Sequence, residues 1–152
     1  MQLPHPKLNF PPINLRVKGS GTTIQVWDPL RRSYIVLTPE EWVRRHVVGF
    51  LLSELSIPAA QIVQEYPVVV NAQNQRADVV VLSRQGKPLL MVECKAYDVK
   101  LSQSTLDQAV RYNSVLSARY IMLTNGVSHH IYECVDSQGY YRPLKTFSDL
   151  EL

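Results

Sequence analysis

Two apolar runs on either side of Gln85-Gly86 constrain the fold of this chain more than any other feature. The runs cover Ala77 to Ser83 and Pro88 to Ala96, and each contains four consecutive large apolar residues. Short runs of this kind, bounded by turn residues, predict β-strands. A Gln-Gly step between them suits a tight two-residue turn. The sequence therefore predicts an antiparallel hairpin at the centre of the fold.

A two-residue loop at Gln85-Gly86 would fix the register of this hairpin. In that register Asp78 lies opposite Glu93. Because side chains alternate along a strand, Lys95 falls on the same face as Glu93 and Cys94 on the other. A loop one residue longer or shorter would make the two carboxylates diagonal neighbours instead. The hairpin is thus predicted to gather two carboxylates and one amine on one face.

Two carboxylates placed opposite each other need a physical reason. Like charges across a strand pair are destabilising, by roughly 0.2–1 kcal/mol, and aspartate is depleted in strands. Mg²⁺ would remove the repulsion, because it binds hard oxygen ligands and contacts substrate phosphates. Such a metal activates a bound water and stabilises charge on a phosphoryl oxygen, and a lysine can hold the phosphate. Alternatively, Lys95 simply neutralises Asp78 and Glu93 on a solvated face.

The rest of the chain predicts two helices and further strands around this hairpin. Thr38-Pro39-Glu40-Glu41 is a helix start with Thr38 as the cap and Glu41 completing a capping box, and the helix should reach about Leu55. A second helix is expected from a Ser104 cap to about Ser117. Strands are expected over residues 22–27, 34–37, 65–71, 120–124 and 130–135. Pro67 favours an edge position for its strand, since proline donates no ladder hydrogen bond.

A helical wheel separates the two acids at the start of the first helix. Glu40 falls in the middle of the apolar face, three residues before Val43, where a buried acid needs a reason. Glu41 lies off that face toward Arg45, and we expect Arg45 on a solvated helix face.

Length and composition indicate one globular domain. The chain has 152 residues, of which 45% are hydrophobic, and contains no phosphate-binding loop and no room for a motor domain. The net charge of +3 is too small to indicate a nucleic-acid-binding protein on its own. The sequence shows no signal peptide and no apolar membrane span, and its two cysteines are no disulfide framework. We therefore expect a cytoplasmic protein with no membrane partner.

Three segments are expected along the chain. Residues 1–21 are rich in proline and glycine and predict either an extended arm or a strap packed on the surface. Residues 22–135 form the predicted domain, and residues 136–152 form a polar, peripheral tail.

Five short segments of the chain form a recognisable set. They are Val26-Trp27-Asp28-Pro29, Thr38-Pro39-Glu40-Glu41-Trp42-Val43-Arg44, Arg76-Ala77-Asp78-Val79-Val80-Val81, Val92-Glu93-Cys94-Lys95-Ala96 and Gln108-Ala109-Val110-Arg111-Tyr112. Together these segments resemble the PD-(D/E)XK nuclease superfamily. The chain looks most like the stand-alone relatives of the N-terminal nuclease domain of type I restriction enzyme R subunits, over about residues 25–135. The resemblance implies an α/β fold, with a restriction-endonuclease-like αβββαβ core whose central mixed sheet is flanked by helices.

The resemblance also implies roles for individual residues. Asp78 and Glu93 would hold Mg²⁺ or Mn²⁺ together with the backbone carbonyl of Cys94, and Lys95 would be the catalytic lysine. Ala77 stands where the family name has proline, a change that many relatives tolerate. The implied accessory residues are Glu40, Gln108 and Tyr112.

The implied function is metal-dependent hydrolysis of phosphodiester bonds in DNA by an endonuclease, related to restriction or DNA processing. Contacts to nucleic acid are expected from Arg31, Arg32, Arg44 and Arg76. The partners implied are DNA, a motor or specificity subunit, and a second copy of the chain. Two alternatives stay open: a catalytically silent DNA-binding or assembly module that needs a partner, and a structural α/β domain with a coincidental charged hairpin.

Overall fold

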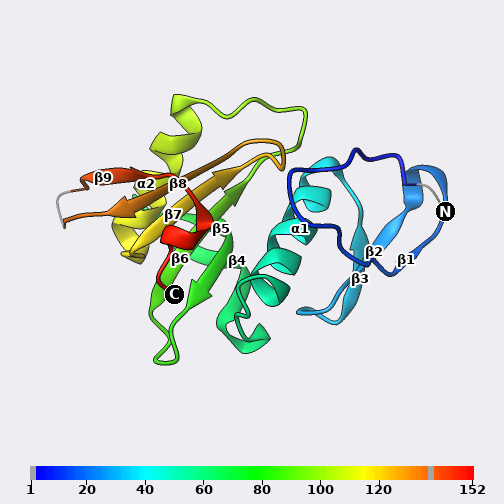
Figure 1. Ribbon diagram of the computed structural model, residues 1–152, viewed down its shortest axis with the longest axis horizontal. Coiled ribbons are helices and arrows are strands. Elements are labelled where there is room, and N and C mark those ends of the chain that lie inside the picture. Colours follow the sequence, from blue (N-terminus) through cyan, green and yellow to red (C-terminus); the bar gives the residue numbers. More distant parts are fainter. Residues whose placement is uncertain (1–2, 137–138) are drawn as a thin grey trace.

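The computed structural model describes residues 3–136 and 139–152, which form two sheets and two α-helices (Figure 1). A small sheet has the order β1-β2-β3, with strands Val17–Lys18, Gln25–Asp28 and Ser33–Val36. The helices are α1 (Pro39–Ser53) and α2 (Gln103–Leu116). The large sheet has the order β4-β5-β6-β7-β8-β9, with strands Ile62–Val70, Gln73–Leu82, Pro88–Cys94, Tyr120–Thr124, His129–Cys134 and Tyr141–Leu144.

The large sheet is mixed, as the sequence predicted. Strands β6 and β7 are parallel and are joined through α2, whereas the other neighbouring strands are antiparallel. The order of α1, three strands, α2 and two strands confirms the restriction-endonuclease-like αβββαβ core. Strand β4 is an edge strand, which confirms the position expected for Pro67.

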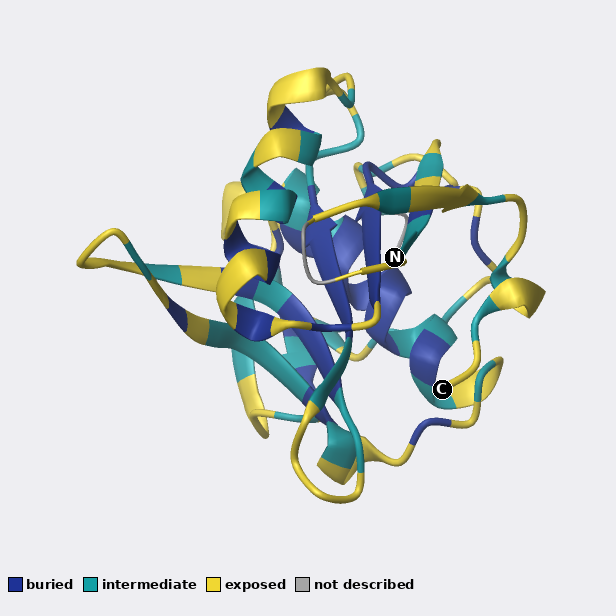
Figure 2. Ribbon diagram, turned by 90° about the vertical axis from the view of Figure 1, so that its left-hand side faces the viewer, coloured by how far each residue is buried: buried dark blue, intermediate teal, exposed yellow. Residues whose placement is uncertain are grey.

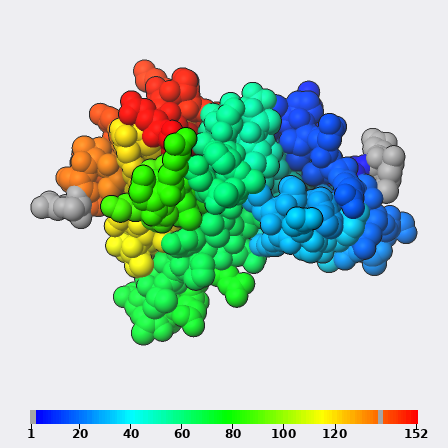
Figure 3. All heavy atoms as spheres, turned by 90° about the horizontal axis from the view of Figure 1, so that it is seen from below, coloured from blue at the N-terminus to red at the C-terminus, as the bar shows by residue number. Residues whose placement is uncertain are grey.

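The helices cover opposite faces of the large sheet. Val79 and Val81 of β5 pack in the core cluster that contains Val43 and Val47 of α1. Val80, between them, packs in a second cluster with Ala109, Tyr112 and Leu116 of α2. This alternation follows from the period of two along a strand. The buried stretches of the central strands lie between the helices (Figure 2), and the small sheet lies at the opposite end of the molecule from β8 and β9 (Figure 3).

The N-terminal segment packs as a strap. Leu8 and Phe10 are buried in the cluster beneath α1, and the amide of Asn9 donates to the Gly126 carbonyl at 2.7 Å. Gly126 has a φ of +85°, and a Cβ atom there would lie 2.8 Å from Leu8 Cδ1. Only glycine therefore fits where the strap crosses the loop before β8.

The turn between β5 and β6 is longer than predicted, yet the predicted register holds. Leu82 pairs with Pro88, and the Ser83 amide donates to the Lys87 carbonyl. Three residues therefore lie between Ser83 and Lys87, where a turn of two residues was predicted. A bulge between Val81 and Leu82 then shifts the register by one residue. Val79 consequently pairs with Val92, as the two-residue loop predicted, because the bulge cancels the extra turn residue.

Two predicted helix caps are wrong in part. The Glu41 amide donates to Thr38 Oγ1 at 3.1 Å as expected, but the Glu41 carboxylate binds Arg44 and Arg45 instead of closing a capping box. Helix α2 begins at Gln103, so Ser104 lies inside the helix and Ser102 precedes it.

The C-terminal tail contributes an edge strand that the sequence analysis did not predict. Strand β9 pairs antiparallel with β8, from Ile131–Leu144 to Cys134–Tyr141. Among the described residues, neither helix is long and apolar enough to cross a membrane.

Candidate active site

Asp78 and Glu93 meet where β5 and β6 diverge. The last printed pair of the ladder on this side is Val79–Val92. Beyond it, the Cys94 amide donates to Asp78 Oδ2 at 2.8 Å, and the Asp78 amide lies 3.4 Å from Glu93 Oε1. Each carboxylate thus accepts from the opposite strand. The two carboxylates take the place of backbone carbonyl acceptors at the point where β5 and β6 separate, which we call the strand fork.

Glu93 is a buried acid whose ionised form is unfavourable. It is 4% exposed, and burial together with the negative charge of Asp78 raises its pKa to about 8. Lys95 acts in the opposite direction, but its effect is smaller. In the absence of a further cation, Glu93 therefore keeps its proton near neutral pH.

Arg44 already supplies one positive charge to this site. Its side chain is 8% exposed, and Nη2 lies 2.9 Å from Asp78 Oδ1 while Nη1 lies 3.0 Å from Glu41 Oε1. A surface contact to nucleic acid, which the sequence analysis expected of Arg44, does not fit this buried and paired position. The signal was hidden because the acids that bind Arg44 come partly from β5, far away in sequence.

Arg45 is buried as well, so its expected place on a solvated face is wrong. Its Nε donates to Glu41 Oε2 at 2.9 Å, and its Nη1 lies 3.0 Å from Asp28 Oδ1. Gln64 of β4 donates to Asp28 Oδ2 at 2.8 Å and accepts from Arg45. Burial raises the pKa of Asp28, but the charge of Arg45 and the surrounding hydrogen bonds outweigh it, so the pKa is lowered. These four residues form an inner charge cluster that joins β2, α1 and β4.

Glu40 borders the site but is not buried on the apolar face of α1. Its side chain is 47% exposed, and Oε1 lies 3.5 Å from Arg44 Nη2. Partial burial and the charge of Asp78 raise its pKa, against the opposing charges of Arg44 and Lys95. Glu40 therefore interacts electrostatically with Asp78, Arg44 and Lys95.

Gln108 and Tyr112 share one face of α2, as their spacing predicted. Gln108 Nε2 donates to the Tyr112 hydroxyl at 3.1 Å, and that hydroxyl donates to Gln75 Oε1 at 3.2 Å. Burial raises the pKa of Tyr112, and the charges of Glu93 and Asp78 add to this effect. Gln75 was not predicted, because a glutamine in a strand carries no distinctive signal.

Glu65 is a second residue that sequence reasoning missed. It lies inside β4 with a φ of +51°, and its carboxylate reaches Arg31 at 3.0 Å and Arg76 at 3.5 Å. Arg76 is 70% exposed and Arg32 is also exposed, so both remain available for contacts to nucleic acid.

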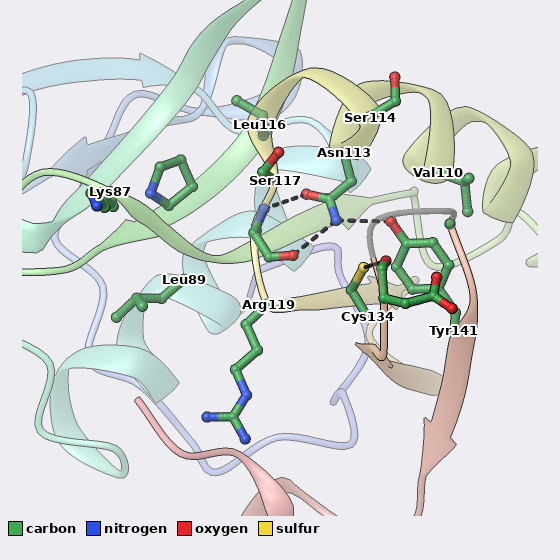
Figure 4. Close-up of a pocket in the computed structure, with 14 residues that line it drawn as sticks. Lys87, Leu89, Val110, Asn113, Ser114, Leu116, Ser117, Arg119, Cys134 and Tyr141 are labelled. Atoms are coloured by element: carbon green, nitrogen blue, oxygen red, sulfur yellow. Dashed lines mark hydrogen bonds between the residues drawn. The ribbon is translucent and has the colours of Figure 1, made fainter.

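A hollow of about 880 Å³ lies away from these residues (Figure 4). It lies between the end of α2 and the start of β6, where Asn113 binds the backbone of Ala118 and the hydroxyl of Tyr141. Asp78 and Glu93 lie toward the other end of their hairpin. None of the predicted site residues lines this hollow.

The oxygen ligands at the strand fork suit a hard cation. Asp78 and Glu93 offer carboxylate oxygens, and the buried acid Glu93 gains from any added positive charge. Within residues 3–136 and 139–152, no group of three or more His, Cys, Asp or Glu side chains is arranged as a metal site.

Comparison with solved structures supports a restriction-enzyme-related fold. A fragment assigned as the HsdR subunit of a type I restriction enzyme from Vibrio vulnificus YJ016 matches with a TM-score of 0.50 and 25% identity, over 73% of this chain and 23% of that one. The type IIG restriction endonuclease BpuSI matches with a TM-score of 0.43 and 20% identity, over 60% of this chain and 11% of that one. The chain thus spans less than a quarter of either relative.

Comparison with sequences gives the family. No curated protein sequence matches the chain significantly. The family profile described as "Type I restriction enzyme R protein N terminus (HSDR_N)" matches residues 39–147, from the start of α1 to beyond β9. Since this match covers more than half of the chain, the protein belongs to the family of type I restriction enzyme R protein N-terminal domains.

Proposed function

We propose that this protein is a metal-dependent endonuclease that hydrolyses phosphodiester bonds in DNA. The observation that carries the proposal is the pairing of Asp78 with the buried acid Glu93 across the strand fork. A buried acid with a raised pKa, beside a second carboxylate, is typical of a functional site.

The residues fit a divalent cation such as Mg²⁺ or Mn²⁺. Asp78, Glu93 and the backbone carbonyl of Cys94 would hold it, since hard oxygen ligands match these ions. A bound ion would polarise the scissile phosphate and lower the pKa of the attacking water. It would also offset the cost of ionising Glu93 at its 4% exposed position.

The side chains around the carboxylates have supporting roles in this proposal. Lys95 orients the attacking water or holds the phosphate as a point charge. Arg44 fixes the Asp78 carboxylate through Oδ1, and Glu40 lies at the open side of the site. Gln108 and Tyr112 position the substrate from α2.

A second candidate is a DNA-binding or assembly module that cuts only with a partner. One observation favours it: Arg44 Nη2 lies 2.9 Å from Asp78 Oδ1, so one oxygen of this carboxylate is already paired within the fold. The partner would be a motor subunit, a specificity subunit or a second copy of this chain.

Incubation of the purified protein with duplex DNA and Mg²⁺ or Mn²⁺ tests the proposal. We expect metal-dependent cleavage that is lost in both Glu93→Ala and Lys95→Ala. An exposed substitution in the β5–β6 turn, Gln85→Ala, is the matched control and should cut like the unaltered protein. Cleavage that persists in both site variants would refute the assigned site. Metal binding without cleavage would favour the module that needs a partner.

A further inference from the structure

The hairpin formed by β4 and β5 projects from the body of the protein next to the candidate site. Figure 2 shows it extending beyond the helices, and its tip also stands out in Figure 3. Residues 71–74 and Arg76 are exposed, whereas Val68 and Ala77 are buried in the cluster that contains Ala109 and Tyr112 of α2. The tip of the ribbon and its face away from α2 are therefore available to a ligand.

The tip of this hairpin is a two-residue turn. Val70 pairs with Gln73, and the two residues between them, Asn71 and Ala72, have φ values of +51° and +62°. Positive φ at both central residues is the turn geometry that matches the twist of a two-stranded ribbon. The ribbon is therefore a preformed shape that needs little ordering when it meets a ligand.

The chemistry of the ribbon favours nucleic-acid bases. From Tyr66 to Ala77 the sequence has no acidic residue, but it has two asparagines, two glutamines and one arginine. Amide side chains donate to and accept from base edges, with asparagine and glutamine suited to adenine. Arg76, which is 70% exposed and lies 3.5 Å from Glu65, adds a guanidinium group that suits a phosphate.

Both faces of the ribbon carry such groups. On the face toward α2, Gln73 and Gln75 line a hollow of about 160 Å³ together with Gln108, Arg111 and Tyr112. On the other face Asn74 pairs with Val69, which is 56% exposed. An exposed valine suits contact with a thymine methyl group.

The position of the ribbon relative to the carboxylates fits a single DNA duplex. Strand β5 runs from the tip directly to Asp78, and the six steps along the chain from Ala72 to Asp78 span about 20 Å. The major groove of B-form DNA is about 12 Å wide and admits a two-stranded ribbon. A backbone phosphate at Asp78 would thus leave the ribbon within reach of the adjacent groove.

We infer that the β4–β5 hairpin, residues 66–77, is a DNA-binding element that enters the major groove and contacts base edges through its amide side chains. This inference builds on the proposed function, because it takes DNA as the substrate of the Asp78–Glu93 site. It adds where the duplex is held and which side chains distinguish base pairs.

The test measures binding separately from cleavage. The full-length chain is titrated into short labelled duplex DNA, with Ca²⁺ in place of Mg²⁺, and binding is followed by fluorescence anisotropy. The double variant Gln73→Ala/Asn74→Ala should weaken binding about tenfold. Arg76→Ala should lower the slope of log affinity against log salt by about one unit. Because these side chains are exposed, the variants should fold normally, which circular dichroism and thermal melting check.

A matched control comes from the other end of β5. Arg84→Ala/Gln85→Ala removes one basic and one amide side chain from the exposed β5–β6 turn. It should leave the affinity within about twofold, as expected for a site that contacts no base. Equal losses from the two double variants would overturn the inference, as would unchanged binding by the hairpin variant or no DNA binding by the unaltered protein. Tighter binding to duplex RNA would also overturn it, because the deep major groove of RNA excludes a ribbon.

The outcomes separate the inference from the proposed function. Hairpin-dependent binding to DNA without any cleavage in Mg²⁺ would support the inference and count against independent nuclease activity. Metal-dependent cleavage with no effect of the hairpin variant on affinity would support the nuclease and refute the inference.

Discussion

Two buried acids in this protein, Asp28 and Glu93, are held in opposite electrostatic environments. Asp28 lies in the inner charge cluster, where Arg45 and several hydrogen-bond donors lower its pKa. Glu93 lies at the strand fork, where burial and Asp78 raise its pKa to about 8. In the inner charge cluster the carboxylate of Asp28 is paired with a cation, whereas at the strand fork a second carboxylate lies beside Glu93. A buried acid whose pKa is raised beside a second carboxylate indicates a functional site more clearly than the presence of acids alone.

Neighbouring arginines of α1 allow the sharpest test of this comparison. Arg45→Met should destabilise the protein by about 3–5 kcal/mol, because it removes the nearer of the two cations that pair with buried Asp28 and leaves only Arg31 at 3.6 Å. Arg44→Met should cost less, because the Asp78 side chain is 15% exposed to solvent whereas that of Asp28 is fully buried. Urea unfolding of both variants measures the difference. Equal losses would show that the fork is as much a part of the folding framework as the inner cluster.

The two acids should also give opposite pH dependences of stability. The pKa of Glu93 is raised in the folded state, so its contribution is favourable below its unfolded value of 4.5 and is lost as pH rises through about 8. The pKa of Asp28 is lowered, so its contribution is present above 3.8 and is lost as pH falls. Thermal melts from acid to alkaline pH should therefore show that Glu93→Gln gains stability relative to the unaltered protein as pH rises. A constant difference across that range would contradict the raised pKa.

Removal of the Arg44 charge from the strand fork should change the affinity of the site for Mg²⁺. Arg44 lies 2.9 Å from a proposed metal ligand, so its charge opposes a bound Mg²⁺. Arg44→Met should tighten Mg²⁺ binding by about tenfold, which corresponds to about 1.4 kcal/mol. Isothermal titration calorimetry measures this, and Arg45→Met serves as the control with a more distant change in charge. Unaltered affinity in the Arg44 variant would argue against Asp78 as a metal ligand.

The smallest predicted effect concerns the hydrogen bonds between α2 and β5. Tyr112→Phe removes the hydroxyl that joins Gln108 to Gln75 and should cost about 0.5–1.5 kcal/mol of stability. If this network only supports packing, cleavage should change in proportion to stability. If the variant is fully folded but cleaves less DNA, the functional site also includes the Tyr112 hydroxyl of α2. Stability from chemical denaturation and initial cleavage rates distinguish these outcomes.

The central sheet was predictable from sequence because its apolar runs and turn residues are local signals. The pairing of Val79 with Val92 followed from the hairpin even though the turn itself differs. Proline at position 67 correctly indicated an edge strand. These features depend on residues close together in the chain, which is where patterns of sequence are informative.

The environments of the arginines were not predictable in the same way. A helical wheel places Arg45 off the apolar face of α1, but it cannot show that Asp28 and Gln64 close over it from two strands. Strand β9 was missed for a related reason. Its four residues include Arg142 and Pro143, and only its pairing with β8 makes it a strand.

The compensated turn between β5 and β6 has a consequence for how this site can vary among related chains. The bulge between Val81 and Leu82 offsets the one extra residue of the turn, so a turn longer than two residues is compatible with Asp78 beside Glu93. A further change of one residue in the turn would need a matching change in the bulge to keep the two acids aligned.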